Sequence, residues 1–180
     1  MGIRQHAAVL LALLVPAAAG AHEHNRAMFL GVSGRTGGSM LWGVHGSYEE
    51  VLFKGKHSDH SVCNPRHWSA VLDASAHFRS HDGFAITGGL SYTIFGSCPK
   101  PGKYPQFLPT VYALPIGKQK TGTLTDDSWR WVGVLGAQLD LLVRREDGIR
   151  AQVDVIQNYG GDHATNVRFS IGLLLRFFNH

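Results

Sequence analysis

A histidine-rich segment in the first half of the chain has the spacing of a metal site. His57, His60, Cys63 and His67 follow one another at intervals of three or four residues, with Asp59 among them. Imidazole and thiolate groups are the usual protein ligands of zinc, so this set could gather a metal ion. A polar loop that happens to contain several histidines is the commoner origin of such a pattern. We therefore predict no metal and no other cofactor.

The second candidate chemistry is a disulfide between Cys63 and Cys98, the two cysteines of the chain. An exported protein with two cysteines in neighbouring connections most simply forms one bond between them. That bond would remove the thiolate from the histidine-rich segment. The disulfide and the zinc site are therefore alternatives, and the sequence favours the disulfide.

The first 21 residues have the three parts of a secretory signal peptide. Arg4 precedes an apolar run at residues 7–15, and small residues follow as far as Ala19-Gly20-Ala21. The run is shorter than the roughly 20 residues that a spanning helix needs. Cleavage after Ala21 predicts an exported chain with a leader at residues 22–26 and one domain at residues 27–178.

The new N-terminus would begin His22-Glu23-His24. Its free amine, two amides and the imidazole of His24 could form a square-planar site for Cu(II) or Ni(II). A disordered polar leader is the commoner explanation, so this remains a weak candidate.

The composition indicates a surface that is not fully in water. Charged residues make up 17% of the chain, below the roughly 25% of an ordinary soluble domain. The 17 Lys and Arg and the 13 Asp and Glu are scattered along the sequence. This distribution predicts no nucleic-acid partner.

Alternating polarity predicts eight strands. Side chains of a strand point to opposite faces in turn, so a regular two-residue period indicates a strand between two different media. The last segment is the clearest, because its odd positions from Val167 to Phe177 are all apolar. The segment at residues 108–117 is the weakest, because Pro109 and Pro115 each lack a backbone donor. The expected strands are residues 27–35, 39–53, 67–79, 84–94, 108–117, 129–143, 149–156 and 167–178.

The polar faces of these strands predict a filled interior. In a small barrel embedded in lipid the lumen is polar and only wide enough for side chains, whereas a soluble barrel keeps its apolar face inside. Acids and bases occur together on the polar faces. An exposed polar face would be expected to carry Lys and Glu, but none of the nine residues selected is either. The predicted lumen network is Asp73, His77, Gln138, Asp140, Arg150, Gln152, Asp154, Arg168 and Arg176.

The end of the chain resembles the closing signal by which outer-membrane barrels are recognised for assembly. The matching residues are Ser170, Gly172, Leu175 and Phe177, and the chain continues with Phe178-Asn179-His180. The resemblance implies that the last strand is presented to the barrel-assembly machinery.

More broadly, the chain resembles the small eight-stranded outer-membrane β-barrel proteins related to the OmpA membrane domain and OmpX. The resemblance implies an all-β fold: an eight-stranded antiparallel up-and-down transmembrane β-barrel. It further implies location in the cell outer membrane, contact with its lipid, a monomer, periplasmic termini and, in most members, no catalysis. Loops then carry any interaction, so no single biological role follows. The similarity is sharpest at Gly136-x-Gln138-x-Asp140, the turn at residues 144–148, Arg150-x-Gln152-x-Asp154 and Asn166-x-Arg168-x-Ser170-x-Gly172.

Periplasmic termini place the connections at residues 54–66, 97–107 and 144–148 on the periplasmic end. Cys63 and Cys98 then fall at the same end, as a disulfide requires. Two of these connections are longer than two of the outer ones, the reverse of the usual pattern. The sequence therefore leaves undecided whether the orientation or the assignment of the first hairpin needs to change.

Two other functions remain as alternatives. One is a soluble periplasmic barrel that binds a small apolar ligand. The other, less favoured, is a lipid-modifying outer-membrane enzyme, because His163-Ala164-Thr165-Asn166 loosely resembles the His-x-Ser-Asn motif of a lipid A deacylase. Thr stands where that motif has Ser, and the segment is expected in a loop. We therefore predict that the protein is not an enzyme.

Overall fold

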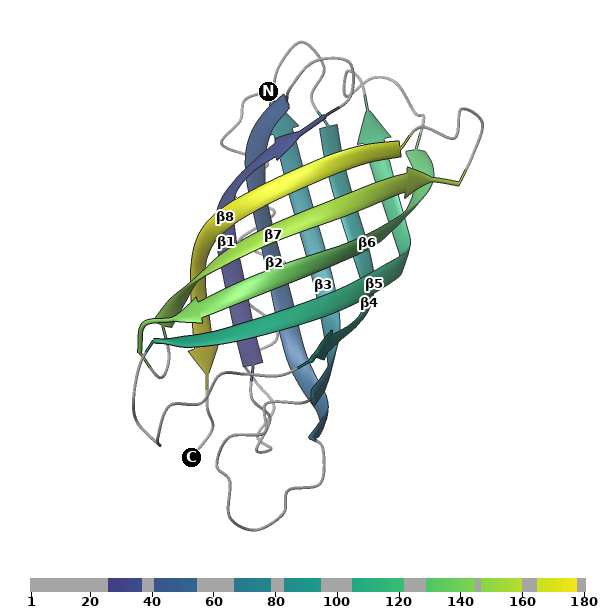
Figure 1. The fold of residues 1–180 in the computed structure, drawn as a ribbon. Coiled ribbons are helices and arrows are strands. Elements are labelled where there is room, and N and C mark those ends of the chain that lie inside the picture. The colour runs from purple at the N-terminus through teal and green to yellow at the C-terminus, as the bar shows by residue number, and fades with distance from the viewer. Residues whose placement is uncertain are drawn as a thin grey trace.

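The chain folds as one closed barrel of eight antiparallel strands, each paired with its neighbours in sequence and β1 paired with β8 (Figure 1). The computed structural model describes residues 26–36, 41–54, 67–78, 83–94, 105–121, 129–144, 147–159 and 165–177. The strands are β1 (Arg26–Arg35), β2 (Leu41–Lys54), β3 (His67–Phe78), β4 (Gly83–Thr93), β5 (Gln106–Thr121), β6 (Trp129–Leu142), β7 (Asp147–Asn158) and β8 (Thr165–Phe177). The predicted eight-stranded up-and-down barrel is confirmed.

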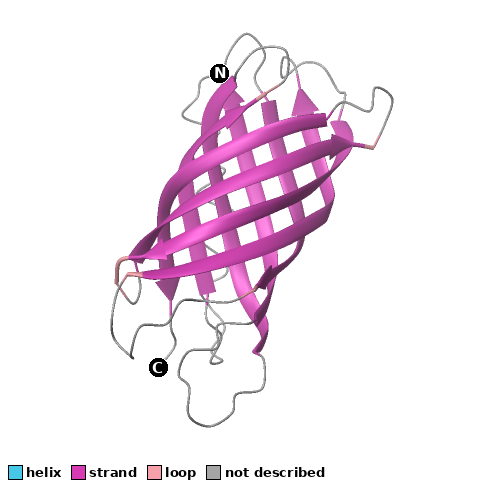
Figure 2. Ribbon diagram, in the orientation of Figure 1, coloured by secondary structure: helices cyan, strands magenta, loops and turns pink. Residues whose placement is uncertain are grey.

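All described elements are strands, tilted steeply around the barrel (Figure 2). In the part of the chain that the structure describes, no helix is long and apolar enough to cross a membrane. We call the end at which β1 begins and β8 ends the terminal end, and the opposite end the distal end. The connections β2–β3, β4–β5 and β6–β7 leave the terminal end. The predicted signal peptide, the predicted leader up to residue 25 and both cysteines lie outside the described residues.

The fifth strand is where the predicted boundaries were wrong. It was expected to be short and weak at residues 108–117, yet β5 runs from Gln106 to Thr121 and is the longest of the eight at 16 residues. The backbone of Pro109 faces β4 at the end of that strand, since its carbonyl accepts a hydrogen bond from Ile94 N at 3.0 Å. The missing donor therefore costs no bond to β6. The other seven strands begin and end within two residues of the prediction.

Pro115 lies in a β-bulge. The pairing of β5 with β6 shifts between Leu114 and Lys118, and its pairing with β4 shifts at the same level. One extra residue in β5 reverses which side its later residues face. Before the bulge the even positions are buried, whereas after it Gly117 and Gln119 are buried and Lys118 is exposed.

The barrel closes where two glycines face each other, Gly31 on β1 and Gly172 on β8. A Cβ built on Gly172 would lie 2.2 Å from Leu30 O and 2.3 Å from Gly31 Cα. Any larger residue would force the first and last strands apart. This close approach is a steric reason for the glycine of the closing signal.

The outer face of the barrel is apolar over its middle. Leu135, Ile171 and Leu173 are more than half exposed, at 65%, 55% and 67%. Other large apolar side chains exposed on this face are Leu30, Val32, Leu72, Leu90, Val111, Leu139, Val153, Val155 and Phe169.

Aromatic side chains lie at both ends of this apolar band. We define the terminal belt as Trp68, Tyr92, Phe107 and Phe177, and the distal belt as Trp42, Trp129, Trp131 and Tyr159. The rings of Trp68 and Tyr92 are 4.8 Å apart. On β3, Phe78 pairs with Trp42 of the distal belt and is ten residues from Trp68 of the terminal belt. Ten residues are about 33 Å of strand, which a tilt of about 40° reduces to a height of about 25 Å.

Candidate functional site

The interior of the barrel holds most of the residues predicted for the lumen. Eight of those nine are buried, at 6% exposure or less, and Arg176 is half-buried. The buried eight are Asp73, His77, Gln138, Asp140, Arg150, Gln152, Asp154 and Arg168. They come from β3, β6, β7 and β8, because alternate positions of each strand turn inward.

One ionic cluster is built around Arg168. Its Nε donates to Asp154 Oδ2 at 2.5 Å, and Nη1 and Nη2 each donate to Asp73 Oδ1 at 3.1 Å. The guanidinium therefore joins β8 to its neighbour β7 and to the more distant β3. Thr87 donates to Asp73 Oδ1 at 3.4 Å, and the amide of Gln152 donates to Asp154 Oδ1 at 3.3 Å.

A chain of three side chains extends this cluster. His45 Nε2 is hydrogen-bonded to Asp73 Oδ2, and His45 Nδ1 lies 2.8 Å from Ser170 Oγ. An ionised carboxylate only accepts hydrogen bonds, so His45 Nε2 carries a proton and donates to Asp73. A neutral imidazole then accepts from the Ser170 hydroxyl at Nδ1. Nearby, Ser33 Oγ lies 3.2 Å from His77 Nε2.

The second ionic cluster is built around Arg150. Its Nε and Nη2 hold both oxygens of Asp140, at 2.6 and 2.9 Å, in a bidentate pair. Nη1 pairs with Glu49 and also donates to Ser47 Oγ at 3.3 Å. The amide of Gln138 donates to the same Glu49 oxygen at 3.1 Å.

Several interior residues were missed from the sequence. Glu49, His45 and Ser47 come from β2, and Tyr112 from β5 accepts a hydrogen bond from Gln152 at 2.6 Å. Glu49 was not among the nine predicted residues, none of which is a glutamate. Its pair with Arg150 shows that a long acidic side chain fits the lumen when a guanidinium lies opposite.

The charges of the interior balance. Among the described residues that face inward, four arginines, Arg35, Arg150, Arg168 and Arg176, accompany four carboxylates, Glu49, Asp73, Asp140 and Asp154. Buried charges are costly unless paired and hydrogen-bonded, so a lumen without bulk water needs such a balance. Replacing Arg150 or Arg168 leaves the carboxylates paired with it without that cation.

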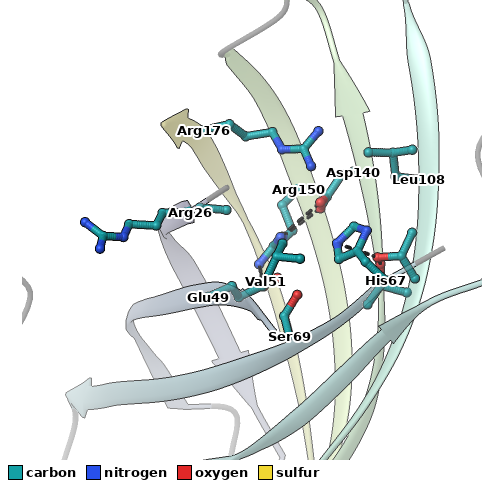
Figure 3. A pocket seen from close by; sticks show the side chains of 12 residues that line it. Arg26, Glu49, Val51, His67, Ser69, Leu108, Asp140, Arg150 and Arg176 are labelled. Atoms are coloured by element: carbon teal, nitrogen blue, oxygen red, sulfur yellow. Dashed lines mark hydrogen bonds and ion pairs between the residues drawn. The ribbon is translucent and has the colours of Figure 1, made fainter. Parts of the chain in front are cut away.

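A small cavity lies at the terminal end of the interior (Figure 3). Its volume is about 20 Å³, enough for one or two ordered waters. Arg150, Asp140 and Glu49 form its inner wall, and Arg176 points toward it from β8 (Figure 3). Ser69 Oγ is buried beside it with no hydrogen-bond partner, which suits a bridging water.

This interior does not fit a small apolar ligand. Its apolar parts are packed clusters: one joins Phe29, Leu108, Leu142 and Leu174, and the other lies around Leu114 and Val132. Ligand cavities of drug-sized molecules are roughly 300–1,000 Å³. The cavity at the terminal end is far smaller, and its lining is mostly polar.

The Ser170–His45–Asp73 chain has the residue types of a hydrolytic triad but not the surroundings. Catalysis needs space beside the nucleophile for the reacting atom and for oxyanion donors. Ser170 is 6% exposed, and it does not line the cavity at the terminal end. Asp73 is also held by Arg168. The arrangement therefore orients and neutralises buried groups.

The deacylase-like segment is placed differently from the expectation. Thr165 and Asn166 belong to β8 rather than to a loop, while His163 lies outside the described residues. Thr165 donates to Gln157 Oε1 at 2.7 Å. With its amide oriented to satisfy both neighbours, Asn166 donates to Thr36 O at 2.6 Å and accepts from Arg35 at 3.0 Å. The Asn166 bonds tie the start of β8 to the end of β1, and the Thr165 bond ties it to β7.

The metal candidates are mostly beyond the described part of the chain, including His22, His24, His57, His60 and Cys63. Among the described residues no group of three or more His, Cys, Asp or Glu could hold a metal ion. His67 begins β3, and its Nε2 lies 3.3 Å from Thr93 Oγ1. The zinc and copper candidates therefore rest on sequence spacing alone.

Comparison with known proteins identifies the fold. No family model matches the sequence, and no curated protein matches it. The N-terminal β-barrel domain of Pseudomonas aeruginosa OprF matches with 16% identity and a TM-score of 0.56, over 88% of this chain and 100% of that one. Neisserial surface protein A matches with 11% identity and a TM-score of 0.56, over 88% and 99%. At these identities the likeness establishes the eight-stranded barrel fold.

Proposed function

We propose that this eight-stranded barrel, which has the fold of outer-membrane β-barrels, is embedded in the outer membrane as a structural or loop-presenting scaffold. Its interior is filled, so we assign it neither a pore nor an active site. The observation that carries the proposal is the inside-out polarity of the barrel. Paired charges such as Arg168 and Asp73 lie inside, and a continuous band of exposed leucine, isoleucine and valine covers the outside.

The dimensions of the outer face support lipid contact. The apolar band is about 25 Å tall in membrane-spanning barrels and is flanked by aromatic girdles, and the two aromatic belts here enclose a band of about that height. A soluble protein rarely exposes more than a few hundred Å² of contiguous apolar surface. The soluble-barrel alternative would place this whole band in water.

The orientation follows from export and assembly. We place the terminal end in the periplasm and the distal end outside, with β8 presented to the barrel-assembly machinery. Leu175 and Phe177 of the closing signal are exposed on the outer face, at 46% and 45%, whereas Ser170 faces inward. A partner that binds the outer face of β8 can therefore contact Leu175 and Phe177 directly.

The interior supports a non-conducting, non-catalytic role. Arg150 and Arg168 anchor ion pairs that cross the lumen at two levels, and both guanidiniums are 1% exposed. Because an eight-stranded barrel is just wide enough for side chains to fill, such contacts leave no continuous water path.

The proposal is tested by expressing the full chain in a Gram-negative host and separating periplasm from outer membrane. We expect the mature protein in the outer-membrane fraction, with a gel mobility that changes on boiling, as a folded barrel resists detergent until heated. Arg144→Gln, which removes an exposed charge outside the strands, serves as a variant that should behave identically. Recovery of folded protein from the periplasm would contradict the proposal.

A further inference from the structure

The bulge in β5 gives the outer face a localised positive charge at the distal belt. Residues after the bulge reverse sides, so Lys118 and Lys120 point outward and Gln119 inward. Without the extra residue, both lysines would enter the lumen. In the register, Lys118 lies opposite Trp131 and Lys120 opposite Trp129.

The lysines and tryptophans form one surface, which we call the Lys–Trp patch: Lys118, Lys120, Trp129 and Trp131. Lys118 Nζ lies 4.8 Å from the centroid of the Trp131 ring, a cation–π contact. Trp129 and Trp131 are 47% and 55% exposed. The contact holds the ammonium group against the ring, at the level where the apolar band ends.

Among the residues that the structure describes, the charges at the distal end of the outer face are positive. Among the described residues, the carboxylates on the outer face are Glu50 and Asp147, and both lie toward the terminal end. Glu50 is also paired with Arg26 at 3.6 Å. Arg130, between the two tryptophans, is exposed at the distal rim, but it pairs with inward-facing Gln119 and so lies on the lumen side of β6 rather than in the patch.

We propose that the Lys–Trp patch binds the phosphate of a membrane lipid headgroup. Tryptophan marks the depth of the headgroups, and lysine stems lie along apolar surface while the ammonium groups reach the polar layer. An anionic lipid therefore meets two ammonium groups and two indole rings at its own depth. A soluble acidic partner would gain nothing from rings buried in lipid. This inference relies on the proposed membrane location.

The test uses purified barrel in neutral detergent micelles and native mass spectrometry to count retained lipid. The probes are phosphatidic acid, diacylglycerol with the same acyl chains, and inorganic phosphate at equal concentration. We expect phosphatidic acid to be retained and the other two not. Lys118→Gln/Lys120→Gln should weaken retention by on the order of tenfold, since each cation near a lipid surface contributes several-fold to binding.

The matched control is Arg144→Gln, which removes an exposed cation at the terminal end. This control should retain as much phosphatidic acid as the unaltered protein. Lys118→Gln alone should retain less than the unaltered protein. Three results would each overturn the inference. They are a loss in Arg144→Gln equal to that in the double lysine variant, retention of diacylglycerol equal to that of phosphatidic acid, and binding of free phosphate equal to that of phosphatidic acid. Heat-modifiable mobility of every variant shows that the barrel is folded. Lipid retention in micelles and outer-membrane fractionation are separate measurements. The lipid-binding inference can therefore fail while the membrane location holds, and the membrane location can fail while lipid binding holds.

Discussion

Arg168 on β8 and Asp73 on β3 are joined across the barrel interior, although β1 and β2 separate their strands. The Nη2 to Oδ1 distance is 3.1 Å, and both residues are 1% exposed. Such a pair connects strands that share no backbone hydrogen bonds. It forms only when the barrel has closed, so the interior network and the closure of β1 against β8 stabilise each other.

Arg168→Met should destabilise the barrel strongly, because it leaves Asp73 and Asp154 without their shared cation. Removing one partner of a buried ion pair costs about 3–5 kcal/mol. Urea titration in micelles, followed by the heat-modifiable gel shift, measures the free energy of unfolding. Arg144→Gln should change it by no more than about 0.5 kcal/mol. Similar losses in the two variants would contradict the structural role of the cluster.

Gly136→Ala should be destabilising because the interior tyrosine occupies the space of a side chain. A Cβ on Gly136 would lie 2.3 Å from Tyr112 Oη and 2.5 Å from Asp154 Oδ1. We expect a cost of about 1–3 kcal/mol, the range for overpacking in a core. In a Tyr112→Leu background the same change should cost less than half as much, which a double-mutant cycle measures. Strict additivity would show that the two residues do not compete for this space.

The filled lumen predicts poor conduction. Purified protein in planar lipid bilayers should show at most small and infrequent openings, because ion pairs cross the interior at the levels of Arg150 and Arg168. Single-channel recording measures this directly. Steady, large conductance from protein whose fold is verified by heat-modifiability would refute the idea of a filled interior.

Cys63 and Cys98 should form a disulfide. Both connections leave the terminal end, since β2 ends at Lys54 and β4 ends at Thr93 there. We expect unfolded, non-reduced protein to resist maleimide until a reductant is added. Closing this loop should stabilise the protein by about 2–4 kcal/mol. Two thiols that label without reduction would instead favour the metal site in which Cys63 lies beside His57, His60 and His67.

Regular alternation made much of the fold predictable. On β3, β6, β7 and β8 the period of two is nearly unbroken, so both the strand and its inward face follow from the sequence. Asp140 and Arg150 could be assigned to the interior, but their direct pairing in the register of β6 and β7 could not. Register depends on turns and neighbours as well as on pattern.

The interior residues of β2 and the length of β5 could not be predicted, because both strands depart from regular alternation. On β2, Glu49 and Glu50 are adjacent, one facing inward and one outward, and a register shift follows at Val51. Neither face could be assigned there, so His45 and Glu49 were missed. On β5 the prolines suggested a weak strand, whereas Pro115 lies in the bulge, where no ladder donor is needed.

The central claim is that the apolar outer face lies in lipid, and the cost of a charge at two depths tests it most directly. Ile171 and Val143 are almost equally exposed, at 55% and 53%, but Ile171 lies in the middle of β8 and Val143 just beyond the end of β6. For folding into lipid vesicles, Ile171→Arg should cost about 2–4 kcal/mol and Val143→Arg about 0–1 kcal/mol. Equal, small costs for both variants, as expected for two residues in water, would contradict a membrane-spanning barrel.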